Sequence, residues 1–347
     1  MRCFFAVLAT LIISIIPAFA DQNKRVTIVA SYEQSHVCGL PQQEGIVSAI
    51  ENKGWYNGQN LTIQYFYMDT KRKNTSIESM KNVASQALSD IKEFKPDVVI
   101  TIDDNAFREV GLPLIKSSKT PVVFSGMNVQ PEQYNNITPF MTNRSKPEGQ
   151  TTGIYEKLYL SRSVRVLKSI GSIKGDTVLA ITDTSPTGKA LTIQIDEELQ
   201  ELPTGLKGEI IVAHSWEEYK SIIKKYNKNK HIFAYYPVAL RLIDKQGTVY
   251  TAPEIFKWTK EHSTKPEMAL NYAFANLGLL GGAAVDFKAM GLQAGAKAGD
   301  ILNGANPGSL SIDDASDYAI VFNRTRAAEL KLVIPHELLT AADHIYY

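Results

Sequence analysis

The sequence predicts an α/β protein of two lobes, each built on a parallel sheet that helices cover on both faces. Short apolar runs alternate with stretches whose apolar residues recur every three or four positions, as expected for strands alternating with amphipathic helices. The segment 128–150, rich in Asn, Pro, Thr and Gly, interrupts this alternation, which then restarts. Beyond residue 20 the chain has 347 − 20 = 327 residues, which divide most simply into two domains.

The first twenty residues have the features of a secretory signal peptide. Arg2 gives a positive start, residues 4–16 are nearly all apolar, and residues 17–20 end in a small-x-small pattern. The apolar run is shorter than the roughly 20 residues that a membrane span needs. We therefore expect cleavage before Asp21 and a protein of the periplasm, with an uncleaved N-terminal anchor as the alternative.

Each element of the first half follows from its own pattern. The clearest helix covers residues 77–94, where apolar residues recur at three- and four-residue steps. It must end at Lys95, because the residue before Pro96 disfavours the helical conformation. In order, the predicted elements are strand 25–30, helix 45–53, strand 61–68, helix 77–94, strand 98–102, helix 106–116 and strand 121–124.

The second half repeats the alternation. Residues 215–218 form a capping box that opens one helix, and Thr251 caps another. The predicted elements are helix 161–170, strand 177–182, helix 188–202, strand 209–213, a helix from Trp216, strand 231–235, helix 253–261, strand 268–272, helix 288–302, a turn-rich linker 303–308, strand 318–322 and helix 325–331. The helix and strand added after the second lobe suggest that the chain passes between the lobes several times.

Composition excludes several classes of function. Without Arg2, 36 basic residues balance 36 acidic ones, which argues against nucleic acid as a partner. The pair His36 and Cys38 lacks a second cluster to complete a metal site, so we predict no metal and no cofactor. Cys38 is the one cysteine beyond residue 20, so no intramolecular disulfide forms. The loop before Gly188 lacks the first glycine of a phosphate-binding loop.

Candidate ligand-binding residues follow from the sheet architecture. In open parallel sheets, ligands bind outside the carboxyl ends of the strands, where helix N-termini offer free backbone amides. The residues at these places are hydroxyls, amides, aromatic rings and a few carboxylates, which suit recognition better than catalysis. The predicted site consists of Ser31, Tyr32, Asp103, Asp104, Ser125, Gly126, Met127, Asn128, Tyr155, Thr184, Ser185, Tyr236 and Tyr272.

The adjacent carboxylates Asp103 and Asp104 end the buried strand 98–102. We expect Asp104 to cap the helix that begins near Ala106. Asp103 stands closer to the strand end, where its carboxylate would bind an ammonium group or hydroxyls. Neighbouring strand residues point to opposite faces, so this pair does not suit general acid and base catalysis. Backbone amides near 125–127 and 184–185 would bind an anionic group, and the tyrosines would stack on an apolar part.

Four segments together carry a resemblance to a known family: Thr-Thr-Gly-Ile-Tyr at 151–155, Lys-Pro-Asp-Val-Val-Ile at 95–100, Ala-Gly-Asp-Ile-Leu-Asn-Gly at 298–304, and the closing segment 327–335. Their order and spacing resemble the ABC-transporter substrate-binding proteins that include bacterial aromatic amino-acid binding proteins, with a type I periplasmic binding protein fold. The resemblance implies two Rossmann-like lobes joined by a three-crossing hinge. It places lobe one at 21–148 and 286–312, and lobe two at 149–285 and 313–347.

The sequence differs from the family pattern at two ligand-facing loops. Residues 103–106 stand where many members carry a small Gly-Thr-Pro-Ala type loop, and residues 125–128 replace the usual next loop. We expect a monomeric periplasmic protein, not an enzyme, that binds a small polar organic ligand, by preference an amino acid or related amine, and delivers it to an ABC permease. A module that presents its closed form to a membrane sensor kinase, and a secreted hydrolase, are the alternatives.

Overall fold

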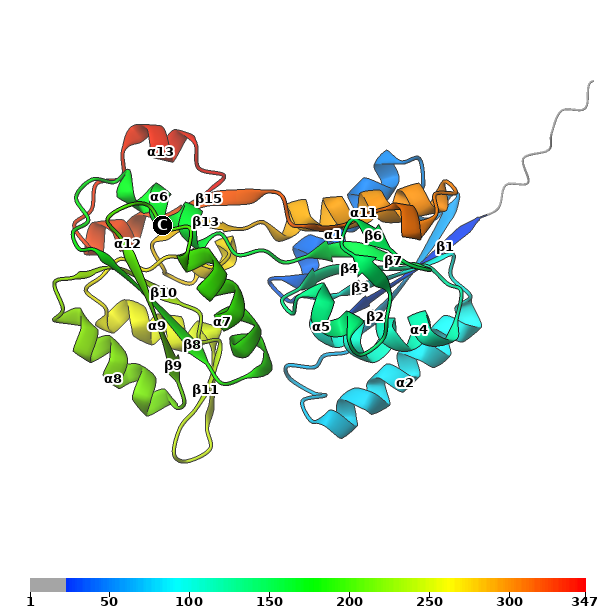
Figure 1. Ribbon diagram of the computed structural model, residues 1–347, viewed down its shortest axis with the longest axis horizontal. Coiled ribbons are helices and arrows are strands. Elements are labelled where there is room, and N and C mark those ends of the chain that lie inside the picture. Colours follow the sequence, from blue (N-terminus) through cyan, green and yellow to red (C-terminus); the bar gives the residue numbers. More distant parts are fainter. Residues whose placement is uncertain (1–22) are drawn as a thin grey trace, which may run out of the picture.

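The computed structural model describes residues 23–347, so the predicted signal peptide lies outside the described residues. The chain forms two lobes that lie side by side and are joined along one side by several segments (Figure 1). The predicted α/β class is confirmed, with parallel sheets in both lobes.

The first lobe is built on a six-stranded sheet in the order β14-β7-β4-β3-β1-β2, and every neighbouring pair in it is parallel. A small hairpin, β5–β6, lies beside it. The strands are β1 Lys24–Ala30, β2 Leu61–Tyr67, β3 Val98–Ile102, β4 Val122–Met127, β5 Met141–Asn143, β6 Lys146–Pro147, β7 Thr151–Tyr155 and β14 Ile312–Asp314.

Helices cover both faces of this sheet. Ile28 packs into the same apolar cluster as α1 and α11, whereas the next residue, Val29, packs into the cluster of α2 and α4. The backbones of α1 and α11 approach closely: a Cβ at Gly291 would lie 2.1 Å from the carbonyl oxygen of Gln42. The helices are α1 Gly39–Asn52, α2 Ile77–Phe94, α3 Asp103–Ala106, a π-helical turn Phe107–Gly111, α4 Leu112–Ser117, α5 Pro131–Asn135, α11 Phe287–Leu302 and a 3-10 turn Pro307–Ser309.

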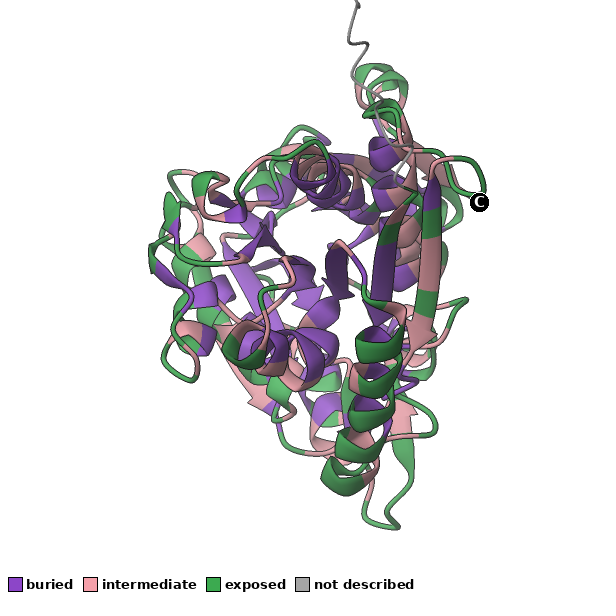
Figure 2. Ribbon diagram, turned by 90° about the vertical axis from the view of Figure 1, so that its right-hand side faces the viewer, coloured by how far each residue is buried: buried purple, intermediate pink, exposed green. Residues whose placement is uncertain are grey.

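The second lobe combines a parallel sheet β10-β8-β9 with a sheet β13-β15-β16, in which β13 and β15 are antiparallel. Isolated bridges at Glu267 and Met268 connect β10 to β13. The elements are α6 Leu160–Lys168, β8 Thr177–Asp183, α7 Pro186–Leu199, β9 Lys207–Ala213, α8 Trp216–Asn227, β10 Ile232–Pro237, β11 Arg241–Ile243, β12 Val249–Thr251, α9 Ala252–His262, α10 Tyr272–Asn276, β13 Gly281–Val285, β15 Tyr318–Asn323, α12 Arg324–Glu329, α13 His336–Thr340 and β16 His344–Tyr346. Figure 2 shows buried strands toward the middle of the molecule and helices whose outer sides are exposed.

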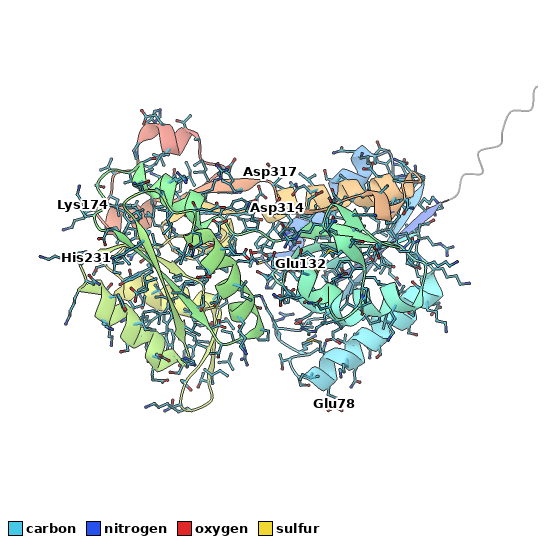
Figure 3. All side chains as sticks on the ribbon, viewed as in Figure 1. Glu78, Glu132, Lys174, His231, Asp314 and Asp317 are labelled. Atoms are coloured by element: carbon cyan, nitrogen blue, oxygen red, sulfur yellow. The ribbon has the colours of Figure 1, made fainter. Side chains whose placement is uncertain are left out.

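The chain passes between the lobes after β7, between β13 and α11, and after β14. The predicted boundaries at residues 148 and 312 therefore differ from the structure, because β7 pairs with β4 and β14 pairs with β7, both in the first sheet. Strand β7 precedes a new run of alternation and so resembles the start of a second domain, although it completes the first sheet. Strand β14, Ile-Asp-Asp, has a single apolar residue to indicate it. Asp314, labelled in Figure 3, lies on the last of these crossings, between the lobes.

Several helices and strands of the structure begin at other residues than those predicted from the sequence. Helix α1 starts at Gly39, six residues before the prediction, and α3 starts directly at Asp103. The predicted strand 268–272 forms only isolated bridges, and β13 follows it instead. Strand β13 begins with Gly281 and Gly282, both at positive φ; a Cβ at Gly281 would lie 2.0 Å from the carbonyl oxygen of Val321. Glycine is rare in strands, so the sequence pattern did not indicate strand β13.

Candidate ligand-binding site

The loops that follow β1, β2 and β3 meet at the carboxyl edge of the first sheet. The backbone N–H of Ser31 donates to the carbonyl oxygen of Ile102, and that of Thr70 donates to the carbonyl oxygen of Ser31. The side chain of Asn105 then donates to the Thr70 hydroxyl over 2.9 Å. This edge brings together Tyr32, Lys71 and Asp103 from three separate parts of the sequence, as strand order in a parallel sheet requires.

Asp103 occupies an unusual position at this edge. Its φ of 67° lies in the left-handed region, which non-glycine residues rarely adopt, and its side chain is only 3% exposed. Within residues 23–347, its Oδ2 atom has no hydrogen-bond partner. A buried carboxylate oxygen without a donor costs folding free energy, so it points to a group that arrives with a ligand.

Asp104 does not cap the helix, contrary to the prediction. Its carboxylate accepts hydrogen bonds from the backbone N–H groups of Asn128 and Val129 and from the Tyr134 hydroxyl. The helix begins at Asp103 instead, and the Ser31 hydroxyl accepts the hydrogen bond from the N–H of Ala106. Asp104 therefore holds the loop after β4 against the loop after β3, and its own oxygens are occupied by the protein.

Glu156 is a second buried carboxyl at the same edge, and the sequence analysis did not identify it. It follows β7 on the first crossing, and its backbone N–H donates to the carbonyl oxygen of Met127 over 2.8 Å. The side chain is 3% exposed, and the charges of Asp103 and Asp104 act on it. Among residues 23–347, no group donates a hydrogen bond to the Glu156 carboxyl, whereas the Gln42 side chain is a hydrogen-bond partner of the Asp103 carboxyl. Neither carboxyl is paired with a cation of these residues.

Burial is the main cause of the raised pKa values of Asp103 and Glu156, which we call the acidic pair. Burial raises the pKa of Asp103 to about 7; the nearby Lys71 charge opposes this rise and Asp104 adds to it. Burial, followed by repulsion from Asp103, also raises the pKa of Glu156 well above its ordinary value. Two buried carboxyls whose charges repel resist ionising together unless a cation binds near them. The arrangement is therefore suited to bind a positively charged group.

This geometry predicts a pH dependence of binding. A cationic ligand binds the ionised form of Asp103, and protons compete for it below its pKa of about 7. The dissociation constant should therefore rise roughly tenfold between about pH 8 and about pH 6, with one or more protons released on binding. Titration calorimetry in buffers of different ionisation enthalpy measures both quantities. A dissociation constant that stays flat across this range would contradict the role of Asp103.

The remaining predicted residues of the first lobe have partners within the protein. The Ser31 hydroxyl donates to the carbonyl oxygen of Ile102, and the Ser125 hydroxyl donates to Oε1 of Gln42. Gly126 has a φ of 74°, and a Cβ there would lie 2.6 Å from the same Gln42 oxygen. Met127 is fully buried. We infer that Ser31, Ser125, Gly126 and Met127 fix the conformation of the loops. None of the four has a free polar side-chain atom that could bind a ligand.

Asn128 contributes to a contact between the lobes. Its carbonyl oxygen accepts a hydrogen bond from Nε2 of Gln194 on α7, over 2.8 Å. Oε1 of Gln194 accepts from the N–H of Leu158 on the first crossing, and the side chain is 5% exposed. The backbone N–H of Asn128 also donates to Asp104. A continuous set of hydrogen bonds therefore joins the loop after β3, which carries Asp103 and Asp104, to the second lobe.

Replacing Gln194 by Leu should loosen this contact. The substitution keeps the size of the side chain and removes both hydrogen bonds, leaving the Leu158 N–H without an acceptor. We expect a loss of about 2 kcal/mol in the free energy of unfolding and hydrogen exchange at Leu158 that is roughly tenfold faster. Gln200→Leu, at the exposed end of α7, is the matched control. Unchanged exchange at Leu158 would show that the contact carries no stability.

The predicted residues of the second lobe fall into two groups. Tyr236 is 1% exposed; burial, and then the charges of Glu198 and Glu156, raise the pKa of its hydroxyl. Thr184 and Ser185 instead line a separate cavity of about 250 Å³, together with His214 and Arg241, at the start of α7. The acidic pair does not line this cavity.

The last two tyrosines lie close to the crossings. The Tyr155 hydroxyl accepts a hydrogen bond from Arg144, whose guanidinium lies 4.3 Å from the Tyr155 ring centre. Arg144 also pairs with Glu132, which Figure 3 labels at the side of the first lobe that faces the second. Tyr272 packs against Phe287 across the second crossing, with 6.1 Å between ring centres.

Between residues 23 and 347, no three or more His, Cys, Asp and Glu side chains are grouped so as to hold a metal ion. Over this stretch, no helix combines the length and the apolar character needed to cross a membrane.

Comparison with known proteins agrees with this fold. A sequence model of the family described as ABC transporter substrate binding protein matches residues 27–346. A curated protein described as "Tyrosine-binding protein", from Clostridioides difficile (strain R20291), is 23% identical over 337 residues. The match covers 94% of this chain and 86% of the relative.

Solved structures give the same fold. The chain is similar to an ABC domain in complex with L-Trp from Streptococcus pneumoniae, with a TM-score of 0.67 and 18% identity. It is also similar to the ligand-free, open structure of a substrate binding protein with adhesive properties from Clostridium difficile, with a TM-score of 0.69 and 18% identity. Each match covers 93% of this chain and 99% of the other. The predicted fold of two lobes with a hinge, type I among periplasmic binding proteins, is confirmed.

Proposed function

The chain belongs to the family of ABC transporter substrate-binding proteins, and from this premise we propose that it captures an amino acid and delivers it intact to an ABC permease. Members of this family act outside the cytoplasm, and we place this protein in the periplasm. The ligand's ammonium group binds between Asp103 and Glu156, at the edge where the sheet of the first lobe meets the first crossing.

One observation carries the choice of ligand. Asp103 and Glu156 are each 3% exposed, and neither carboxyl is neutralised by a hydrogen-bonded or ion-paired cation among residues 23–347. A buried carboxylate left unpaired is costly, and an ammonium group supplies three charge-assisted hydrogen bonds. A neutral sugar supplies only hydroxyls, and a dicarboxylate adds repulsion.

Hinge closure follows from where the two carboxyls lie. Asp103 directly follows β3 at the edge of the first sheet, whereas Glu156 lies on a segment that joins the lobes. A ligand that contacts both, and Tyr236 beyond them, makes its full set of contacts only when the lobes approach. It therefore shifts an existing equilibrium toward the closed form.

Two of the similar proteins suggest which amino acids to test first. One is a tyrosine-binding protein and another was solved with L-Trp, so aromatic amino acids head the panel. Tyr32 and Tyr236, both buried beside the acidic pair, support this order because they offer aromatic surface to a ligand ring.

A thermal-shift panel tests the proposal. The panel holds L-tyrosine, L-tryptophan, the other common amino acids, amines without a carboxylate, sugars and dicarboxylates. We expect an amino acid to raise the melting temperature in proportion to ln(1 + [L]/Kd), with a Kd of about 1 μM, and to be recovered unchanged after long incubation. Stabilisation by sugars or dicarboxylates alone would refute the ligand class, and turnover of the ligand would refute a binding role.

A further inference from the structure

We propose that Lys71 binds the carboxylate of the ligand and thereby makes the site select amino acids over amines that lack a carboxylate. This inference rests on the proposed function, because it concerns the other end of the same ligand. Lys71 lies on the loop after β2, at the carboxyl edge that also presents Tyr32 and Asp103.

The contacts of Lys71 leave its charge unpaired. Its Nζ atom lies 3.9 Å from the centre of the Tyr32 ring and 3.3 Å from Nε2 of His36. Burial, and then the charges of Lys71 and Arg72, lower the pKa of His36 to about 3, so its ring is neutral. Among residues 23–347, no carboxylate oxygen lies within 4.0 Å of the Lys71 ammonium.

Two neighbouring cations differ from Lys71 in this respect. Arg72, the next residue, pairs with Asp69 at 3.1 Å and with Glu33 at 3.7 Å. Arg108, on the helical segment after Asp103, pairs with Glu109 at 2.7 Å and donates to the side chain of Asn105. Both guanidinium groups therefore already hold acceptors of the protein, whereas the Lys71 ammonium is held by an aromatic face and a neutral ring.

The position of Lys71 relative to the acidic pair fits the two ends of an amino acid. Its charge acts on both Asp103 and Glu156, although it is too far from either to form an ion pair. Lys71 therefore does not neutralise either carboxyl, and both remain available to the ammonium group of a ligand. A carboxylate one carbon away from the ligand's ammonium would meet the Lys71 charge above the Tyr32 ring.

The test compares two probes that differ only in the carboxylate. Titration calorimetry gives Kd for L-tyrosine and for tyramine with the wild type, Lys71→Gln and Lys71→Arg; L-tryptophan and tryptamine replace them if the panel ranks tryptophan first. We expect Lys71→Gln to weaken L-tyrosine roughly 10- to 100-fold and to leave tyramine within about threefold, with partial recovery in Lys71→Arg. Lys73→Gln, on the same exposed loop, is the matched control and should change neither value.

The outcomes separate this inference from the proposed function. If Lys71→Gln weakens the binding of both probes equally or changes neither, Lys71 does not bind the ligand's carboxylate. The inference then fails while the proposed function stands. If Lys71→Gln strengthens both, Lys71 competes with the ligand for the acidic pair, which also overturns the inference. If the wild type binds neither amino acid nor amine, the proposed function itself fails. Lys71 is exposed, so the melting temperature of each empty variant should match that of the wild type.

Discussion

Replacing Asp103 by Asn should abolish amino-acid binding at micromolar concentrations. The substitution removes the charge that pairs with the ligand's ammonium and keeps the shape of the side chain. Asn also tolerates the positive φ of 67° at this position. We expect Kd to rise roughly 100-fold, which corresponds to about 3 kcal/mol. Titration calorimetry at about pH 8 measures the change, with Asp90→Asn on the exposed side of α2 as the matched control.

The same variant should make the empty protein more stable. A carboxyl whose folded pKa is raised stabilises the fold most below its unfolded pKa, and this contribution is lost as pH rises through the folded value of about 7. At about pH 8 the ionised, buried Asp103 destabilises the wild type, whereas the neutral Asn of Asp103→Asn does not. The free energy of unfolding of the variant should therefore be roughly 1–4 kcal/mol higher. A variant that binds normally, or that is less stable than the wild type at this pH, would contradict the assignment of Asp103.

Replacing Arg326 by Met should destabilise the second lobe more than any other change considered for it. The Arg326 guanidinium on α12 donates to Glu267, whose side chain is fully buried, to the carbonyl oxygen of Ser263 and to Glu329. Removing it leaves the Glu267 carboxyl buried without its cation. We expect a loss of about 3–5 kcal/mol and a fall of roughly 10 °C in the melting temperature.

Two further variants make this prediction specific. Arg324→Met changes an exposed arginine on the same helix and should have little effect. Glu267→Leu combined with Arg326→Met removes both charges and should recover much of the loss, because no buried charge remains unpaired. Calorimetric scans of the empty protein measure all three. Equal losses in the single and double variants would show that packing around Arg326, and not its charge, holds the tail of the chain to the lobe.

Local patterns predicted most of the fold. The apolar periodicity of 77–94 identified α2, and the runs of Val and Ile identified β3 and β4, because each signal lies within a few adjacent residues. The local pattern could not predict which lobe contains β7. Its pairing with β4 is a contact between distant parts of the chain, and a buried run of five residues, Thr-Thr-Gly-Ile-Tyr, fits either sheet equally well.

The candidate site was predictable only in part, for the same reason. Asp103 was found because it directly follows a buried strand. Glu156 lies beyond β7, where no strand end was expected, and Lys71 lies on a polar loop that resembles any other. Among the residues that the structure describes, Asp103 and Glu156 are distinguished by burial without a paired cation, and the exposed Lys71 by an ammonium without a paired carboxylate. These features arise only when loops from separate strands meet at one edge. The helix-cap prediction for Asp104 failed because Asn128 and Tyr134, distant in sequence, supply its donors.

A crystal structure with the tightest amino acid of the panel tests the central claim most directly. The ligand nitrogen should lie roughly 2.7–3.0 Å from Oδ2 of Asp103 and from a carboxyl oxygen of Glu156, with both lobes in contact with the ligand. An amino acid seated elsewhere, for example in the cavity beside Thr184 and Arg241, with Asp103 and Glu156 still lacking partners, would contradict the account.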